Sequence, residues 1–145
     1  MRLARSSEWG IPVSLSNIQR AIQSALEAAN GTYSGVRQAS AVTPCYVYEI
    51  TSAAIDVTTA GIPALCHWTI TVQIEAIADT VNDCLDLIED VRGIFDSPVT
   101  DTTYNCVLVL SAFSVTMSTE SIDDGKTDAE RIGTIQLELL VQETL

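Results

Sequence analysis

The residues of this sequence that could carry chemistry are one histidine, His67, and four cysteines. The cysteines are widely spaced and form no C-x-x-C pair of the kind that holds zinc on a turn: Cys45, Cys66, Cys84 and Cys106. Each lies in an apolar-patterned segment, so we expect four reduced thiols that act as small hydrophobic groups. No motif marks a thiol or hydroxyl beside His67, so a catalytic pair would depend on the fold bringing two such groups together.

An acidic loop over Ser118–Glu130 is the second candidate for chemistry. Its segment Asp123-Asp124-Gly125-Lys126-Thr127-Asp128 is similar in composition to a calcium loop. It lacks the D-x-D-x-D-G spacing and the glutamate at the twelfth position, so we interpret it as a solvated hairpin tip. The sequence also lacks glycine-rich phosphate-binding motifs. We therefore expect no catalytic residue, no metal and no cofactor.

Length and charge restrict the function further. The 145 residues are the size of one domain, and a hydrophobic fraction of 47% is enough to form a core. The formal charge is −12, and an acidic surface repels phosphate, which argues against specific DNA binding. No segment approaches the roughly 20 apolar residues of a membrane span, and residues 1–10 do not have the pattern of a secretory signal. We expect a protein that is made in the cytoplasm of its host and binds no membrane.

Hydrophobic periodicity predicts the elements that would position these residues. Helical spacing of apolar residues predicts one helix over Ser16–Asn30, capped by Ser16, and another over Val81–Phe95. Alternation of apolar and polar residues predicts strands, most clearly where Trp68, Ile70, Val72 and Ile74 share one face. The other expected strands are Cys45–Ile50, Ala53–Thr59, Cys106–Met117 and Ile132–Gln142.

The order of these elements predicts the fold class. We expect an α+β fold with a mostly antiparallel sheet of four to five strands and two helices packed on one face. An N-terminal arm over residues 1–15 would precede a single domain over residues 16–145. Two further apolar faces are expected to join this core, one from the second helix and one from the last strand: Val81, Cys84, Leu85, Ile88, Val91 and Phe95; Ile135, Leu137, Leu139 and Val141. In the strand before the acidic loop, alternate residues are expected to share one face: Val107, Val109, Ser111, Phe113, Val115 and Met117.

Three segments resemble the tail terminator, or tail completion, proteins of tailed bacteriophages. The first is the early helix followed by the proline-led aromatic strand Pro44-Cys45-Tyr46-Val47-Tyr48. The second is the strand Trp68–Asp79 that runs directly into a helix. The third is a polar excursion followed by Arg131-Ile132-Gly133-Thr134-Ile135, in which an arginine opens the final strand. The resemblance covers about Ser16–Gln142 and consists of an order of elements.

The resemblance implies a structural virion protein that is not an enzyme. Such proteins form a ring, typically a hexamer, that caps the head-proximal end of the tail tube, stops its polymerisation and joins the tail to the head connector. The expected partners are therefore other copies of the chain, the tube protein and the connector, with DNA passing through without specific binding. The arm and the acidic loop supply the candidate interface residues: Trp9, Glu120, Asp123, Asp124, Lys126, Asp128, Glu130 and Arg131.

Two other interpretations remain open at this point. One is a different neck protein of the same virions, a head-completion or head–tail adaptor protein. The other is a small cytosolic enzyme or ligand-binding domain that uses the sheet face carrying His67 and Glu75.

Overall fold

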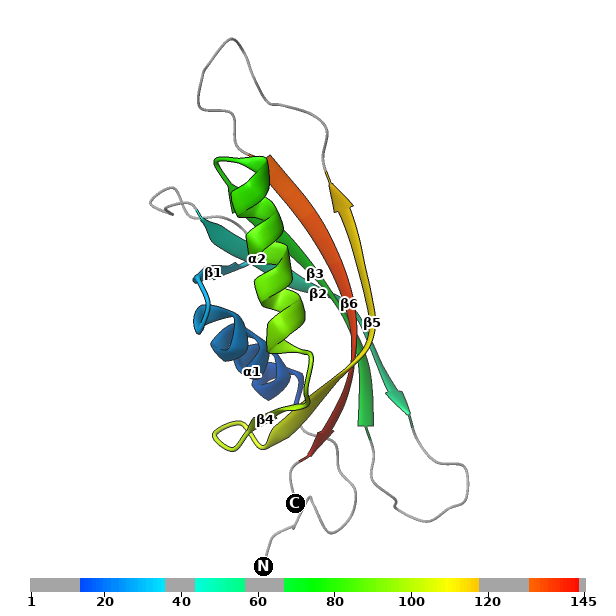
Figure 1. The fold of residues 1–145 in the computed structure, drawn as a ribbon. Helices are drawn as coiled ribbons and strands as arrows, with labels where there is room; N and C mark the ends of the chain where they lie inside the picture. Colours follow the sequence, from blue (N-terminus) through cyan, green and yellow to red (C-terminus); the bar gives the residue numbers. More distant parts are fainter. Residues whose placement is uncertain (1–13, 36–43, 57–66, 118–130, 144–145) are drawn as a thin grey trace, which may run out of the picture.

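The computed structural model describes residues 14–35, 44–56, 67–117 and 131–143. These residues form two helices and six strands (Figure 1). In chain order they are α1 (Leu15–Glu27), β1 (Gly31–Ser34), β2 (Cys45–Asp56), β3 (His67–Ala78), α2 (Val81–Ile94), β4 (Val99–Asp101), β5 (Cys106–Met117) and β6 (Arg131–Glu143).

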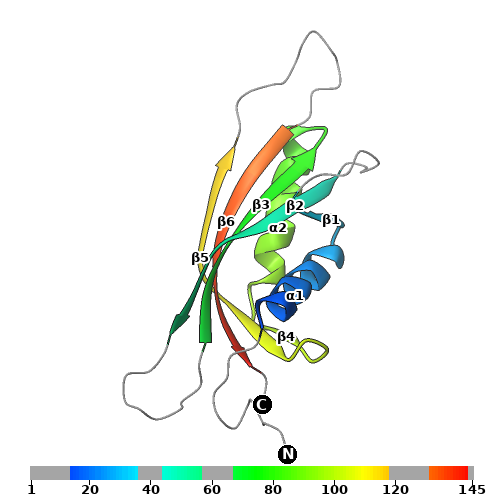
Figure 2. The ribbon, with the colours of Figure 1, turned by 180° about the vertical axis from the view of Figure 1, so that it is seen from behind.

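The six strands form one mixed sheet in the order β1-β2-β3-β6-β5-β4. The β1–β2 pair is parallel and the other pairs are antiparallel. The sheet curls into a half-barrel, and both helices occupy its hollow (Figures 1 and 2). The expected fold class, a mostly antiparallel sheet of four to five strands with the helices on one face, is therefore wrong. The short strands β1 and β4, of 4 and 3 residues, were missed because alternation cannot be recognised over so few positions.

The curl is associated with two bulges that lie in the same row of the sheet. The pairing of β2 with β3 shifts between Ile50 and Ser52, and the pairing of β5 with β6 shifts between Leu110 and Ala112. Each extra residue has a hydroxyl that donates to the neighbouring strand, Thr51 Oγ1 to Thr71 O at 3.3 Å and Ser111 Oγ to Glu138 O at 3.1 Å. Because Thr71 pairs with Glu138, both bulges bend the sheet at one level. Thr51 also joins the two separately expected strands of this region into the single strand β2.

The concave face of the sheet packs against the helices and forms the main core. The alternation expected in β3 is confirmed, since Ile70, Val72 and Ile74 are fully buried there. The apolar face of β6 is also confirmed, with Ile135, Leu137, Leu139 and Val141 all buried. From α1, the core receives Ile18, Ala21, Ile22 and Leu26. Ser14 caps this helix by accepting from Asn17 N at 3.2 Å, so the expected cap at Ser16 is wrong by two residues.

Helix α2 begins after Thr80, and it presents a different face to the core from the expected stripe. Thr80 Oγ1 caps the helix by accepting from Asp83 N at 3.1 Å. Val81 and Leu85 are exposed, however, and Leu87 is buried instead. The hydroxyl of Tyr46 donates to Leu87 O at 2.9 Å and ties this turn of the helix to β2.

The expected face of β5 is wrong in its first half. Cys106 and Leu108 are buried and Leu110 is half-buried, whereas Val109 and Ser111 are exposed. After the bulge, Phe113 is on the face of β5 that points toward α2. One inserted residue reverses the alternation, because side chains on a strand point to opposite faces with a period of two.

Candidate assembly interface

The described thiols that could act as nucleophiles are buried. Cys45, Cys84 and Cys106 lie inside the protein and form no disulfide, and Cys66 lies outside the described residues. Burial raises the pKa of the Cys84 thiol, and burial together with Asp101 raises the pKa of the Cys106 thiol to about 11. Both shifts disfavour the thiolate, which is the reactive form.

The two residues proposed for a ligand-binding sheet face lie far apart. His67 begins β3 opposite Asp56, and Glu75 lies eight residues later on the same strand, opposite Val47 and Thr134. At about 3.3 Å per residue this separation is roughly 26 Å. The fold therefore does not bring His67 and Glu75 to one small-molecule site. Within the described ranges, no group of three or more His, Cys, Asp or Glu side chains could hold a metal ion.

Of the interface residues expected from the sequence, only Arg131 is among the described residues. It is the first residue of β6, pairs with Ala78 of β3 and is half-buried. Trp9 and nearly all of the arm lie outside the described residues. The same holds for the six candidate residues of the acidic loop: Glu120, Asp123, Asp124, Lys126, Asp128 and Glu130. Their role in assembly stays a prediction.

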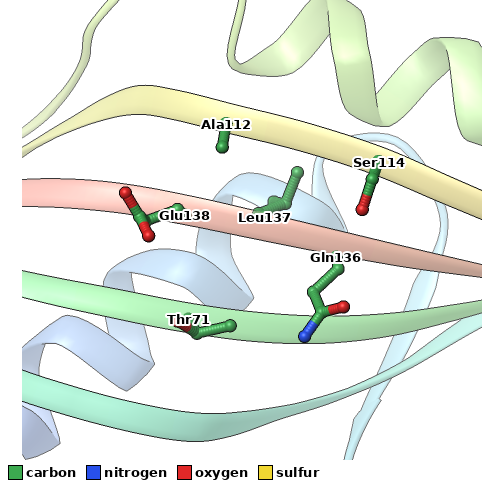
Figure 3. A pocket seen from close by; sticks show the side chains of 6 residues that line it. All are labelled: Thr71, Ala112, Ser114, Gln136, Leu137 and Glu138. Atoms are coloured by element: carbon green, nitrogen blue, oxygen red, sulfur yellow. The ribbon is translucent and has the colours of Figure 1, made fainter.

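The convex face of the sheet, which points away from the helices, carries acidic and neutral polar side chains beside a small apolar cluster of Cys45, Val47, Ile77 and Ile132. Its carboxylates on β2, β3 and β6 include Glu49, Glu75 and Glu138, and no lysine or arginine shares this face among the described strand residues. A shallow hollow of about 290 Å³ lies at the row of the bulges (Figure 3). The short side chains of Thr71, Ala112 and Ser114 leave this space, and the carboxylate of Glu138 accepts from Ser111 Oγ at 2.9 Å. The face is suited to lie near a polyanion without binding it.

One edge of the sheet is open along most of β5. Among the described residues, only β4 pairs with the outer side of β5, and it covers Cys106–Leu108. The remaining stretch, Val109–Met117, contains no charged residue and no proline. We call this stretch the β5 edge. Natural proteins usually protect such edges with charges, proline or short strands, so an unprotected edge is a surface on which another strand can add.

A second open edge lies on the opposite side of the sheet. Within the described part of the chain, β1 pairs with β2 only at Cys45–Tyr48. Among the described residues, the outer side of β2 is open beyond Tyr48 to its end at Asp56, and the stretch between the two carboxylates Glu49 and Asp56 includes Thr51–Ile55, which we call the β2 edge. The β2 edge carries no charge and is exposed throughout. The two edges lie toward opposite ends of the sheet, since β2 and β5 run in opposite directions and each is open in its second half (Figures 1 and 2).

An apolar groove of about 430 Å³ lies beside the β5 edge, between β5 and α2. Leu85, Ile88, Phe113 and Val115 supply its apolar surface, and Leu85 and Val115 remain 44% and 39% exposed. Its two charged residues already satisfy each other, because Arg92 Nε donates to Glu89 Oε2 at 2.6 Å. The exposed side of the α2 stripe thus faces a groove rather than the core.

The composition of the sequence contains a signal for the β5 edge that does not depend on periodicity. Residues 102–119 form a run of 18 residues without a charge in a chain that is 18% charged. A strand of this composition at the border of a sheet is an association surface. Periodicity alone could not show that β5 is at a border, because the order of strands is set by tertiary structure.

Comparison of the sequence with models of known protein families and with curated proteins found no match. No helix in the described segments is long and apolar enough to cross a membrane. The function proposed below depends on the order of elements and on the geometry of the two edges.

Proposed function

We propose that this chain is a structural protein that assembles into a homomeric ring and caps the tail tube of a tailed bacteriophage. The observation that carries the proposal is the presence of two uncharged open edges on opposite sides of one sheet. Because these are different surfaces, contact between them is heterologous, and heterologous contacts form closed rings or open filaments. The resemblance to tail terminators favours the ring, in its hexameric form, at the head-proximal end of the tube.

The charge of the chain supports passage of DNA rather than binding. Each copy carries a formal charge of −12, and on the described strands the convex face has carboxylates without a lysine or arginine beside them. Where such a face borders the channel, it attracts no phosphate and releases no counterions, so DNA slides without a sequence-specific contact. The ring would then connect the tube to the head connector while leaving the channel open.

A deletion of the gene in the phage that encodes this chain tests the proposal. We expect filled heads and separate tails whose tubes are unterminated or overlong, with normal virions restored by the wild-type gene supplied from a plasmid. Electron microscopy of the lysate measures tail length and the fraction of joined particles. Normal-length tails firmly joined to heads in the deletion strain would refute the proposal.

The same experiment separates the other neck function from this one. Tails of normal length with finished ends, together with heads that leak DNA, would identify a head-completion protein. The two outcomes differ in tail length, which is measured on the same micrographs.

A further inference from the structure

We infer that copies of this chain join head to tail by strand addition, with the β2 edge of one copy pairing with the β5 edge of the next. The inference rests on the proposed ring and names the surfaces that form it. It commits to a second copy of the chain as the occupant of both edges.

The topology of the sheet makes this pairing antiparallel. β2 and β6 run in one direction and β3 and β5 in the other, because the three successive pairs β2–β3, β3–β6 and β6–β5 are all antiparallel. When a second copy continues the sheet in the same orientation, its β2 lies beside β5 of the first copy with opposite direction. The outer backbone groups of each edge can then form a regular ladder.

The free stretches limit the register of that ladder. β1 must pass beyond Met117 of the neighbouring copy, because it occupies the outer side of β2 at Cys45–Tyr48. In one copy, the row of the sheet that contains Ile55 crosses β5 at Leu108. If the second copy is shifted by four residues along the strands from that row, the condition is satisfied. This shift places Ile55 opposite Phe113, Ala54 opposite Ser114 and Ala53 opposite Val115. The paired residues also face the same side, since Ile55 and Ala53 pair with Trp68 and Ile70 on the concave face, as Phe113 pairs with Leu137.

The side chains at this junction match on both faces. On the concave face, Ile55 is 39% exposed in the monomer and would lie beside Phe113, at the groove lined by Leu85 and Val115. On the convex face, the small residues Ala54 and Ser114 meet without steric conflict. Burial of Ile55 and of the groove provides apolar stabilisation that neither edge has alone.

Charge explains why a copy of the same chain meets these edges and not its other surfaces. The outer side of α2 exposes four carboxylates near one arginine: Asp83, Asp86, Glu89 and Asp90. The convex face adds further carboxylates, which include Glu49, Glu75 and Glu138. Two copies that met through such faces would bring like charges together. The two edges are uncharged, so they allow contact between two acidic copies without that repulsion.

The displacement is compatible with a closed ring. Four strands per copy, β2, β3, β6 and β5, span about 19 Å at about 4.8 Å per strand, and four residues correspond to about 14 Å along the strand. A ring without net rise then requires the strands to tilt by roughly 35° from the ring axis.

Cysteine cross-linking tests the pairing and its register. Ala54→Cys and Ser114→Cys are small changes at exposed positions, made in a Cys66→Ser background because the described native thiols are buried. We expect that the two variants, expressed together and mildly oxidised, give disulfide-linked dimers, and that each variant alone gives none. The register control pairs Ala54→Cys with Val109→Cys, which lies on the same edge and face five residues away and should not cross-link.

Each outcome decides between the inference and the proposed ring. Cross-links in Ser114→Cys alone would show a two-fold β5–β5 contact and overturn the head-to-tail pairing, and cross-links with Val109→Cys would overturn the register. A wild-type ring without any Ala54–Ser114 cross-link would refute the edge pairing and leave the ring standing. Cross-links together with normal, joined tails in the deletion strain would refute the terminator function and support the pairing.

Discussion

Gly133 lies where β6 passes beneath α2, and a side chain at this position would meet the core directly. A Cβ atom on Gly133 would lie 2.7 Å from Ile88 Cδ1, 3.1 Å from Met117 Sδ and 3.2 Å from Cys84 Sγ. All three atoms are ends of side chains that can yield, so we expect Gly133→Ala to destabilise the fold by about 1–2 kcal/mol rather than to prevent folding. For a domain of this size the Tm should fall by roughly 3–8 °C.

Gly93 supplies the matched control, since it is an exposed glycine in α2 with no atom within 4 Å of the added Cβ. Gly93→Ala should stabilise the protein by up to about 1 kcal/mol, because alanine is the better helix former. Urea unfolding followed by circular dichroism measures both variants.

A double-mutant cycle tests the stated cause of the Gly133 effect. Ile88→Val removes the Cδ1 atom at the shortest contact and alone should cost about 0.5–1.5 kcal/mol. Combined with Gly133→Ala, it should cost less than the sum of the two single changes by about 0.5 kcal/mol or more. Additive effects, or a Gly133→Ala variant as stable as the wild type, would refute the packing described for α2 on β6.

Three further predictions follow from the core and the bulges. Tyr46→Phe should cost about 1 kcal/mol at neutral pH, because it removes the hydrogen bond to Leu87 O. Burial raises the pKa of Tyr46 from 10.0 to about 12. The contribution of the protonated Tyr46 side chain to the free energy of unfolding is therefore complete below pH 10 and is lost as the pH rises toward 12. In urea unfolding experiments the Tyr46→Phe variant should lack this loss. Deletion of Ser111 should leave Leu110 opposite Leu139 and Ala112 opposite Glu138, so the second half of β5 keeps its faces and only the bulge and the Ser111 hydrogen bonds are lost; like Ser111→Ala, the deletion should cost about 1 kcal/mol in the same assay. Alkylation followed by mass spectrometry should label four thiols after unfolding and label the three described, buried thiols only slowly in the native protein; a mass lower by two protons per bridge before reduction would contradict this.

The sequence predicts the long regular elements because burial repeats along them without interruption. β3 and β6 occupy the centre of the sheet and pack against α2, so each alternates strictly, as Ile70 and Leu137 illustrate. β5 follows the same rule on both sides of Ser111, but the inserted residue changes the phase, and nothing in the composition around Ser111 marks a bulge. The position of β1 beside β2 depends on a parallel contact that no local pattern encodes.

The candidate interface was only partly predictable for a related reason. Val81 and Leu85 fit the apolar stripe of α2, yet both are exposed, and Leu85 lines the groove between α2 and β5. The interface residues expected from the sequence lie in the arm and in the charged segment Ser118–Glu130. The open edges are uncharged, and recognising Ala54 or Ser114 as edge residues requires the order of the strands.

Native mass spectrometry of the purified wild-type protein tests the claim of a closed head-to-tail ring most directly. We expect one discrete oligomer, a hexamer, with no larger species as the concentration rises, and a ring in negative-stain images of the same sample. A ladder of ever larger oligomers would show open filaments, and a monomer at every concentration would contradict assembly through the two edges.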